Sequence, residues 1–210
     1  MTATPSANGV PPAAERLLHL VEPVESKVDS AAAEAAIHDL LVALGHDPES
    51  DHLRDTPRRV AAALSEMLTA RPFQLTTFPN DEGYDELVVA RDIPFHSLCE
   101  HHLLPFTGRA HVAYLPGERI LGLSKLARVV ELFSRRLQVQ ERLTSQIAEW
   151  LQNQLKPKGV GVVLDAEHMC MSLRGVAATG SSTMTSALLG RLRDDPRTRS
   201  EFFALTGFNV

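Results

Sequence analysis

Residues 108–115 read GRAHVAYL, and this stretch decides the fold class. Ala110, Val112 and Tyr114 stand at every second position, which is typical of a β-strand that buries one face. A Pro-Gly pair at 116–117 follows directly and favours a turn. The pattern therefore predicts a strand that ends at a tight turn, and the segments on both sides show what the strand packs against.

The flanking segments alternate between strand and helix patterns. Further strands are expected at 86–95, 160–166, 169–177 and 182–189. Apolar residues at helical spacing predict helices over 30–44, 56–68, 124–137, 140–155 and 196–206. We therefore predict an α+β fold in which an antiparallel sheet carries helices packed on one face.

The chain has 210 residues, of which 44% are hydrophobic and 22% charged. This composition predicts one globular domain and excludes collagen-like, coiled-coil and disordered classes. No stretch approaches the roughly 20 apolar residues of a membrane-spanning helix, and no secretory signal is evident, so we expect a cytoplasmic protein without a membrane partner. Residues 1–28 are expected to form a flexible arm with at most one helical turn, at Leu17, Leu18 and Leu20.

Charge is distributed unevenly along the chain. The formal net charge of -5 argues against a general nucleic-acid binder. Residues 1–100 contain 17 acidic and 7 basic side chains, whereas residues 101–210 contain 9 acidic and 14 basic ones. An anionic small molecule would be attracted to the second half.

Both cysteines of the chain stand next to histidines. Cys99 is followed by His101 and His102, and His168 precedes Cys170 by two residues. Thiolate and imidazole together suit zinc, and a strand would point His168 and Cys170 to the same face. These residues could form a closed structural Cys2His2 site, or three of them could bind the ion and leave a position for water. The alternative is that the cysteines are ordinary buried thiols.

Basic residues gather after the first of these pairs. Six Lys or Arg residues and two Glu residues lie between positions 119 and 142. Lys125 and Arg128 would share a helix face beside a helix start, where a polyphosphate would fit, and Arg174 adds positive charge further on. Glu141, with Gln140, could accept hydrogen bonds from the N1 and N2 edge of guanine. Each of these residues alone would be read as part of a solvated helical face.

Four motifs in order resemble type I GTP cyclohydrolase over roughly residues 30–208. They are Cys99-Glu100-His101-His102, Gly122-Leu123-Ser124-Lys125, Gln138-Val139-Gln140-Glu141-Arg142-Leu143-Thr144, and His168-Met169-Cys170 with Arg174-Gly175. The resemblance implies the tunnelling fold, in which subunits join their sheets into a barrel, and a homodecamer with active sites between subunits. It also implies a catalytic domain at 29–210, helical over 29–71 and tunnelling-fold over 84–210.

The implied reaction converts GTP and water to 7,8-dihydroneopterin triphosphate and formate, the first step toward folate or other pterins. Cys99, His102 and Cys170 would hold one Zn²⁺ per subunit, and a water with its pKa lowered toward about 7 would attack guanine C8. His168 would donate a proton to the imidazole ring nitrogen, and His101 would orient or deprotonate the hydrating water.

The resemblance assigns the remaining site residues to parts of the substrate. Ser124 would assist near the ribose, although it could also cap its helix. The guanine edge and the triphosphate would be held by Gln140, Glu141, Lys125, Arg128 and Arg174. Two alternatives are another tunnelling-fold enzyme, such as a pterin aldolase, a pyruvoyl-tetrahydropterin synthase or a deazaguanine nitrile reductase, and a non-catalytic zinc-stabilised assembly module.

Overall fold

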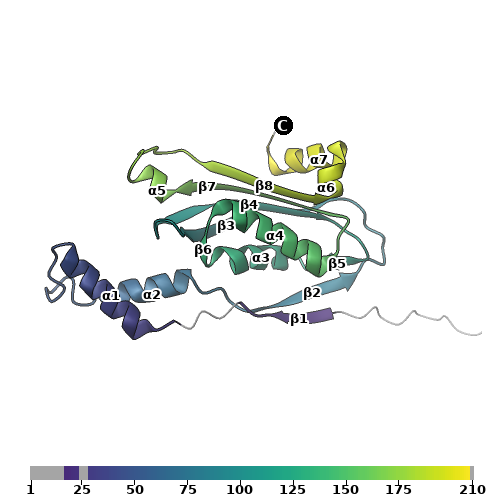
Figure 1. The fold of residues 1–210 in the computed structure, drawn as a ribbon. Coiled ribbons are helices and arrows are strands. Elements are labelled where there is room, and N and C mark those ends of the chain that lie inside the picture. The colour runs from purple at the N-terminus through teal and green to yellow at the C-terminus, as the bar shows by residue number, and fades with distance from the viewer. Residues whose placement is uncertain (1–16, 24–27, 209–210) are drawn as a thin grey trace, which may run out of the picture.

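The computed structural model describes residues 17–23 and 28–208, which form two sheets and seven helices (Figure 1). The strands are β1 Leu17–Val21, β2 Phe73–Pro79, β3 Val88–Cys99, β4 Pro105–Leu115, β5 Arg119–Leu121, β6 Leu137–Gln138, β7 Gly159–His168 and β8 Thr183–Gly190. The helices are α1 Ser30–Ala43, α2 Thr56–Met67, α3 Ser124–Ser134, α4 Gln140–Leu155, α5 Met169–Ser172, α6 Arg191–Asp194 and α7 Pro196–Thr206. None of the helices in these two described ranges is both long enough and apolar enough to span a membrane.

The larger sheet has the strand order β6-β3-β4-β7-β8. Its neighbours are antiparallel, except that the two-residue strand β6 runs parallel to β3. Because β4 lies between β3 and β7 and is antiparallel to both, the carboxyl ends of β3 and β7 meet at one edge of the sheet. Cys99 ends β3 and His168 ends β7, so the topology alone brings the two histidine and cysteine motifs to the same edge.

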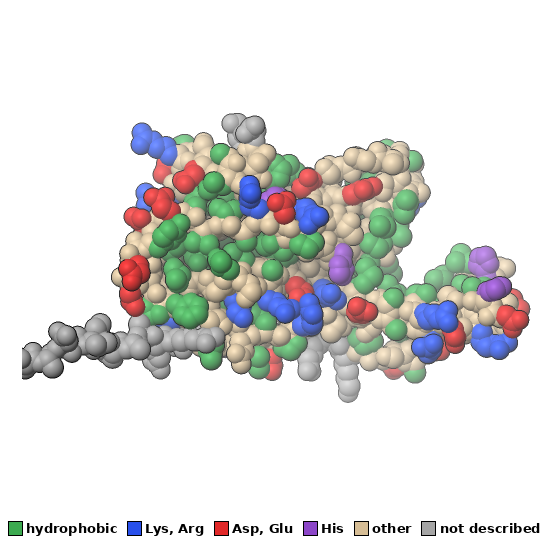
Figure 2. Space-filling view, turned by 180° about the vertical axis from the view of Figure 1, so that it is seen from behind, with side chains coloured by type: hydrophobic (Ala, Val, Ile, Leu, Met, Phe, Trp, Pro, Cys, Tyr) green, Lys and Arg blue, Asp and Glu red, His purple; other side chains and the backbone are tan. Residues whose placement is uncertain are grey.

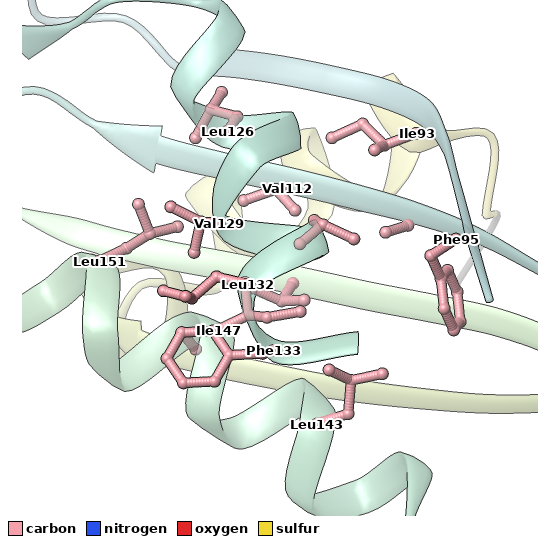
Figure 3. Packing of buried hydrophobic residues seen from close by; sticks show 14 of the residues in the cluster. Ile93, Phe95, Val112, Leu126, Val129, Leu132, Phe133, Leu143, Ile147 and Leu151 are labelled. Atoms are coloured by element: carbon pink, nitrogen blue, oxygen red, sulfur yellow. The ribbon is translucent and has the colours of Figure 1, made fainter. Parts of the chain in front are cut away.

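Helices α3 and α4 cover one face of this sheet, as the apolar spacing predicts (Figure 3). Leu126 and Val129 on α3 and Ile147 and Leu151 on α4 have no exposed surface. Their spacing of three and four residues places them on one side of each helix. These helix residues pack against the alternating residues of β4, of which Val112 is labelled in Figure 3. The predicted strand and the two predicted helices are therefore confirmed as elements, but β4 buries both of its faces over residues 110–115 and not one.

The opposite face of the sheet is covered in part by α6 and α7, whereas the sequence predicts helices on one face. A second core cluster joins Val163 of β7 to Leu192 of α6 and Phe202 of α7. A Cβ atom on Gly161 would lie 2.6 Å from Leu192 Cδ2, so glycine is needed for this close packing. The reason is that β7 is apolar at consecutive positions, and a strand of that kind requires cover on both faces.

A smaller sheet with the order β1-β2-β5 corrects the expectation for the N-terminal arm. The residues expected to form a helical turn lie in β1, where Leu18 pairs with Thr76 of β2. Strands β2 and β5 were not expected. The flexible arm was predicted over residues 1–28, and the parts 1–16 and 24–27 of that range lie outside the described residues.

Two further expectations are wrong near the site. Residues 169–177 do not form a strand, because Met169–Ser172 is a short helix and Gly175 and Ala177 have φ angles of 58° and 49°. These left-handed angles are incompatible with an extended strand. The helix predicted over 124–137 ends earlier, at Ser134. Leu137 lies in β6, where it is 42% exposed and not part of the buried helix face.

Candidate active site

The three residues expected to bind metal converge in the structure. One ligand atom from each of Cys99, His102 and Cys170 lies within 4.8 Å of the other two. The distance from Cys99 Sγ to His102 Nδ1 is 3.6 Å. A tetrahedral site with Zn–S bonds of about 2.3 Å and Zn–N bonds of about 2.0 Å has an edge of about 3.5 Å between these atoms. The two thiols and the imidazole therefore suit Zn²⁺ in their chemistry, and the distance between Cys99 and His102 matches such a site.

The Cys99 side of this group is held by a tight turn at the end of β3. The N–H of Cys99 donates to the carbonyl of Leu104 over 2.9 Å, and the N–H of Leu103 donates to the carbonyl of Cys99 over 2.8 Å. Leu103 has a φ of 55°, which closes the turn through a left-handed residue. Cys99 is buried while His102 is exposed, so one side of the group faces solvent.

The Cys170 side is held differently from the prediction. Cys170 lies in α5, directly after β7, so a helical turn and not a shared strand face brings Cys170 near the site. Burial, and after it the neighbouring Cys99, raises the pKa of the Cys170 thiol, while the charge of Arg174 acts in the opposite direction. A bound cation would favour the thiolate form of both cysteines, which is the form that binds metals.

His168 is fixed on two sides. Its Nε2 lies 2.7 Å from Oε1 of Gln140, and its ring stacks on Phe106 with centroids 4.5 Å apart and an angle of 3°. The side-chain Nε2 of Gln140 donates to the carbonyls of Leu164 and Thr183 and approaches Thr185 Oγ1. Since those partners accept, the Gln140 oxygen must face His168, and His168 Nε2 must be the donor.

This contact was not foreseen from the sequence, and it determines which His168 nitrogen is available. Nε2 is used by Gln140, so Nδ1 remains for proton exchange. Burial lowers the pKa of His168, and the charge of Glu141 acts in the opposite direction. Phe106 was missed as well, because only the strand register, in which Phe106 pairs with His168, places the two rings together.

Three more predicted site residues lie around this group. His101 is exposed, with Nδ1 3.9 Å from Cys99 Sγ. Glu141 is exposed in the first turn of α4, next to the buried Gln140. Arg174 is exposed in the segment that follows α5. The structure therefore gathers metal-ligating, proton-donating and guanine-recognising candidates at one edge of the sheet.

The other three predicted site residues lie elsewhere on the chain. Ser124 and Lys125 begin α3, whose opposite end leads to β6 and the metal-ligating group (Figure 1). An 11-residue helix is roughly 15 Å long. Ser124 does not cap α3, because the N-cap position is Leu123 and no side chain makes a capping hydrogen bond there.

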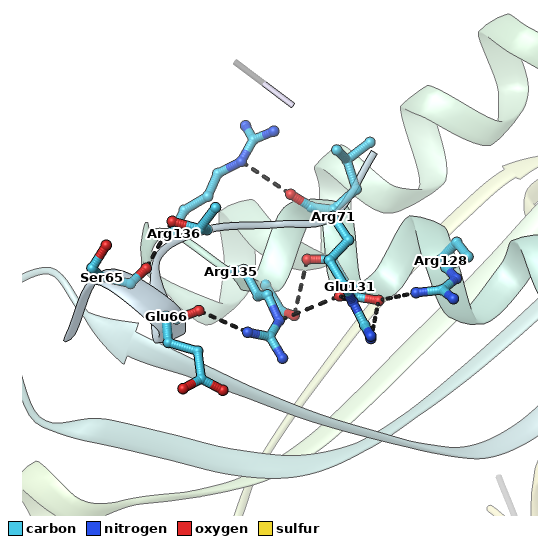
Figure 4. Close-up of polar contacts among 10 residues, drawn as sticks. Ser65, Glu66, Arg71, Arg128, Glu131, Arg135 and Arg136 are labelled. Carbon is cyan, nitrogen blue, oxygen red and sulfur yellow. Dashed lines mark hydrogen bonds and ion pairs between the residues drawn. The ribbon is translucent and has the colours of Figure 1, made fainter. Parts of the chain in front are cut away.

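Arg128 belongs to a network around one carboxylate (Figure 4). Arg128 Nη1 donates to Glu131 over 2.9 Å, and Arg71 Nε donates to the same carboxylate over 2.7 Å. Arg135 Nε lies 3.5 Å from it. Burial acts to raise the pKa of Glu131, but the hydrogen bonds from Arg71 and Arg128 outweigh burial and hold that pKa below its usual value. Three guanidinium groups around one carboxylate leave this surface positive.

Comparison with known proteins agrees with the resemblance noted from the motifs. A sequence model of the GTP cyclohydrolase I family matches residues 33–207. A protein of Synechococcus sp. named GTP cyclohydrolase 1 is 54% identical over 184 residues, which is 86% of this chain and 80% of that protein. Proteins of the same name from Aquifex aeolicus and Streptomyces griseus are 49% and 52% identical, over 85% and 84% of this chain and 97% and 90% of theirs. The chain belongs to the GTP cyclohydrolase I family.

Proposed function

We propose that this protein converts GTP and water to 7,8-dihydroneopterin triphosphate and formate, and that residues 29–210 form its catalytic domain. The observation that carries this proposal is the convergence of Cys99, His102 and Cys170 beside His168 at one sheet edge. The three ligands would hold Zn²⁺, which supplies Lewis acidity and lowers the pKa of water toward about 7 when bound. The reaction is the first step of folate biosynthesis.

The two site histidines that are not metal ligands, His168 and His101, each have a proposed role that their surroundings support. In its doubly protonated form His168 donates the proton on Nδ1 to the imidazole ring nitrogen of guanine, while the N–H on Nε2 stays bonded to Gln140. The stacking of Phe106 keeps the His168 ring in one plane. His101 is exposed beside Cys99 and orients the hydrating water.

The guanine edge is read by Glu141. Its carboxylate is exposed at the first turn of α4 and accepts from N1–H and N2–H of guanine. The side-chain amide of Gln140 is occupied inside the protein, so Gln140 serves guanine binding through its support of His168. The triphosphate is held by Lys125, Arg128 and Arg174, and Ser124 assists at the ribose.

Replacing Glu141 with alanine should lower kcat/KM for GTP by about 10- to 100-fold, because two charge-assisted hydrogen bonds to guanine are lost. Steady-state formate release from GTP and from inosine triphosphate, which lacks N2, measures the change. Selectivity between these two nucleotides should fall while zinc content stays constant. Glu149→Ala, at an exposed position later on α4, is the matched control. An unchanged KM for GTP in Glu141→Ala would contradict this role.

A second copy of the chain is proposed to complete the site. Ser124 and Lys125 lie away from the metal-ligating group within one chain, although one substrate must touch both. Large hydrophobic side chains next to both groups in the sequence are exposed. Leu123, before Ser124, is 71% exposed, and Leu173 and Val176, which follow Cys170, are 72% and 73% exposed. Hydrophobic side chains also gather across the face seen in Figure 2. Such exposure is typical of surfaces that bind a partner. We propose a homodecamer with active sites between subunits and a barrel of joined sheets.

Mixing two inactive variants should restore activity if the site is shared. Cys170→Ala and Lys125→Ala are each expected to be inactive, whereas oligomers assembled from both should regain about a quarter of the activity, since that fraction of interfaces joins two intact halves. Formate release after coexpression measures the recovery. The control mixes Cys170→Ala with His168→Ala, which damage the same half and should not recover. Mixed oligomers with no recovery for the first pair would contradict a shared site.

Membership of the family does not favour the alternatives, namely another tunnelling-fold enzyme or a non-catalytic zinc-stabilised module. The deazaguanine reductase alternative requires a nucleophilic cysteine without metal, whereas both thiols here lie in the metal-ligating group. The cytoplasm remains the location that we propose, since the two cysteines form no disulfide.

A further inference from the structure

We propose that Arg142 and Glu100 form a brace that holds the Cys99–His102 turn against the start of α4 and thereby raises the affinity of the metal-ligating group for zinc. We call this contact the Arg142–Glu100 brace. Neither residue belongs to the ligands or to the substrate-binding set. The inference deepens the proposed function, because it rests on the same three ligands.

The brace is a two-point contact between a guanidinium and a carboxylate. Arg142 Nη2 donates to Glu100 Oε2 over 2.5 Å, and Arg142 Nη1 donates to Glu100 Oε1 over 3.3 Å. Two parallel hydrogen bonds of this kind fix the orientation of both groups. Glu100 lies between Cys99 and His101, so fixing its carboxylate restrains the turn that carries two of the site histidines and one cysteine.

The guanidinium is itself anchored in the buried interior. Arg142 Nε donates to Gln138 Oε1 over 2.9 Å, and Gln138 is 1% exposed. Nε2 of Gln138 donates to the carbonyl of Phe133 and to Gln146 Oε1, both over 2.9 Å. Because both of those partners accept, the Gln138 oxygen is left to face Arg142. The position of the Arg142 side chain is therefore determined by the core between α3 and α4.

The turn needs such a brace because packing does little to hold it. Glu100, His101, His102 and Leu103 are all exposed, and Leu103 takes a left-handed φ. One backbone bond joins the turn to β6, from the N–H of Glu100 to the carbonyl of Gln138 over 3.0 Å. An exposed turn with few apolar contacts is stabilised chiefly by hydrogen bonds, so the loss of the brace should loosen it locally.

The contact should contribute little to the free energy of unfolding, because exposed ion pairs are weak and the side chains of Arg142 and Glu100 are 42% and 33% exposed. Its expected effect is therefore on the ligands that the turn presents. Partners that orient metal ligands from outside the ligand set commonly change metal affinity by 10- to 100-fold. We expect about a 10-fold loss here, because the brace restrains the turn and not a ligand atom.

The test measures zinc affinity of the whole protein by competition with a chromophoric chelator. Arg142→Met keeps much of the aliphatic stem but removes the fork, and it should weaken Zn²⁺ binding about 10-fold. Glu100→Gln should weaken binding to a smaller degree, and the double variant should be no worse than Arg142→Met, because both changes remove the same contact. Arg59→Met is the matched control, since Arg59 on α2 makes an exposed ion pair of 3.0 Å with Asp55, the residue before this helix.

Hydrogen exchange of the metal-free protein supplies a second readout. Amides at 100–103 should exchange faster in Arg142→Met than in the wild type, while thermal unfolding stays unchanged. Zinc affinity and exchange both equal to wild type in Arg142→Met would overturn the brace. A wild-type protein that binds no Zn²⁺ would instead overturn the proposed metal site. In that case faster exchange at amides 100–103 in Arg142→Met would still support the restraint of the turn, and unchanged exchange would overturn it.

Discussion

The Cys170→Ala protein is expected to lose zinc and turnover together. Cys170 supplies one of three ligand atoms that lie within 4.8 Å of one another, and two remaining ligands would not hold Zn²⁺ against a chelator. Formate release should fall to background, which is a loss of at least about 1000-fold if metal chemistry is required. Metal content after dialysis and formate yield from GTP are the two measurements.

The protein should remain folded in this variant, because Cys170 is only half-buried and lies at the margin of the core. Met171→Ala is the matched control, since Met171 is exposed in the same short helix and contributes no ligand atom. That control should keep both zinc and activity. A Cys170→Ala protein that is free of metal and still releases formate at the normal rate would contradict the claim that the reaction requires a bound metal.

The His168→Ala protein is expected to keep zinc and lose chemistry. The three ligands are untouched, but the group that donates a proton through Nδ1 is removed. General acid catalysis contributes typically 100- to 10,000-fold, so kcat should fall by about that factor while zinc stoichiometry stays the same. Single-turnover formate release, together with metal analysis, separates the two effects.

A structural explanation of that loss can be tested with a second variant. Alanine leaves the buried Oε1 of Gln140 without its partner, which costs about 1 to 3 kcal/mol and could disturb the site. Glutamine places an N–H donor near the position of His168 Nε2 but cannot act as an acid. His168→Gln should therefore be as inactive as His168→Ala, and full activity in either variant would show that another group donates the proton.

The helices that cover the sheet were predictable because their apolar residues form one face. Leu126 and Val129, and Ile147 and Leu151, repeat at helical spacing, and each is fully buried in the structure. Strand β4 was predictable for the same kind of reason, with a period of two. In the two helices one face packs and the other does not, so the sequence contains the pattern that the fold requires. Strand β4 keeps the predicted extended form, but it is buried on both faces over residues 110–115, and the alternation of its residues did not indicate the cover on the second face.

Elements defined by their partners were not predictable. Strand β2 is extended because it pairs with β1 on one side and β5 on the other, and a single segment does not reveal such partners. The segment after His168 reads as a strand, but the left-handed angles at Gly175 and Ala177 break it. Alanine rarely takes that conformation, so the sequence gives little warning of it.

The site was predictable in its chemistry but not in its support. The rarity of cysteine and its proximity to histidine predict a metal site, the family resemblance selects Cys99, His102 and Cys170 as its ligands, and the structure brings these three residues together. Gln140 and Glu141 are neighbours on α4, yet one is buried against His168 and the other is exposed. Successive helix positions differ by about 100°, so adjacent residues in one motif face different surroundings.

Formate release from GTP tests the central claim most directly. The purified protein is assayed as isolated, after removal of metal, and after restoration with Zn²⁺, and the pterin product is followed in the same samples. We predict one formate per GTP with a pterin product, lost on metal removal and regained with Zn²⁺. A folded protein that retains Zn²⁺ but releases no formate under any of the three conditions would contradict the proposed reaction.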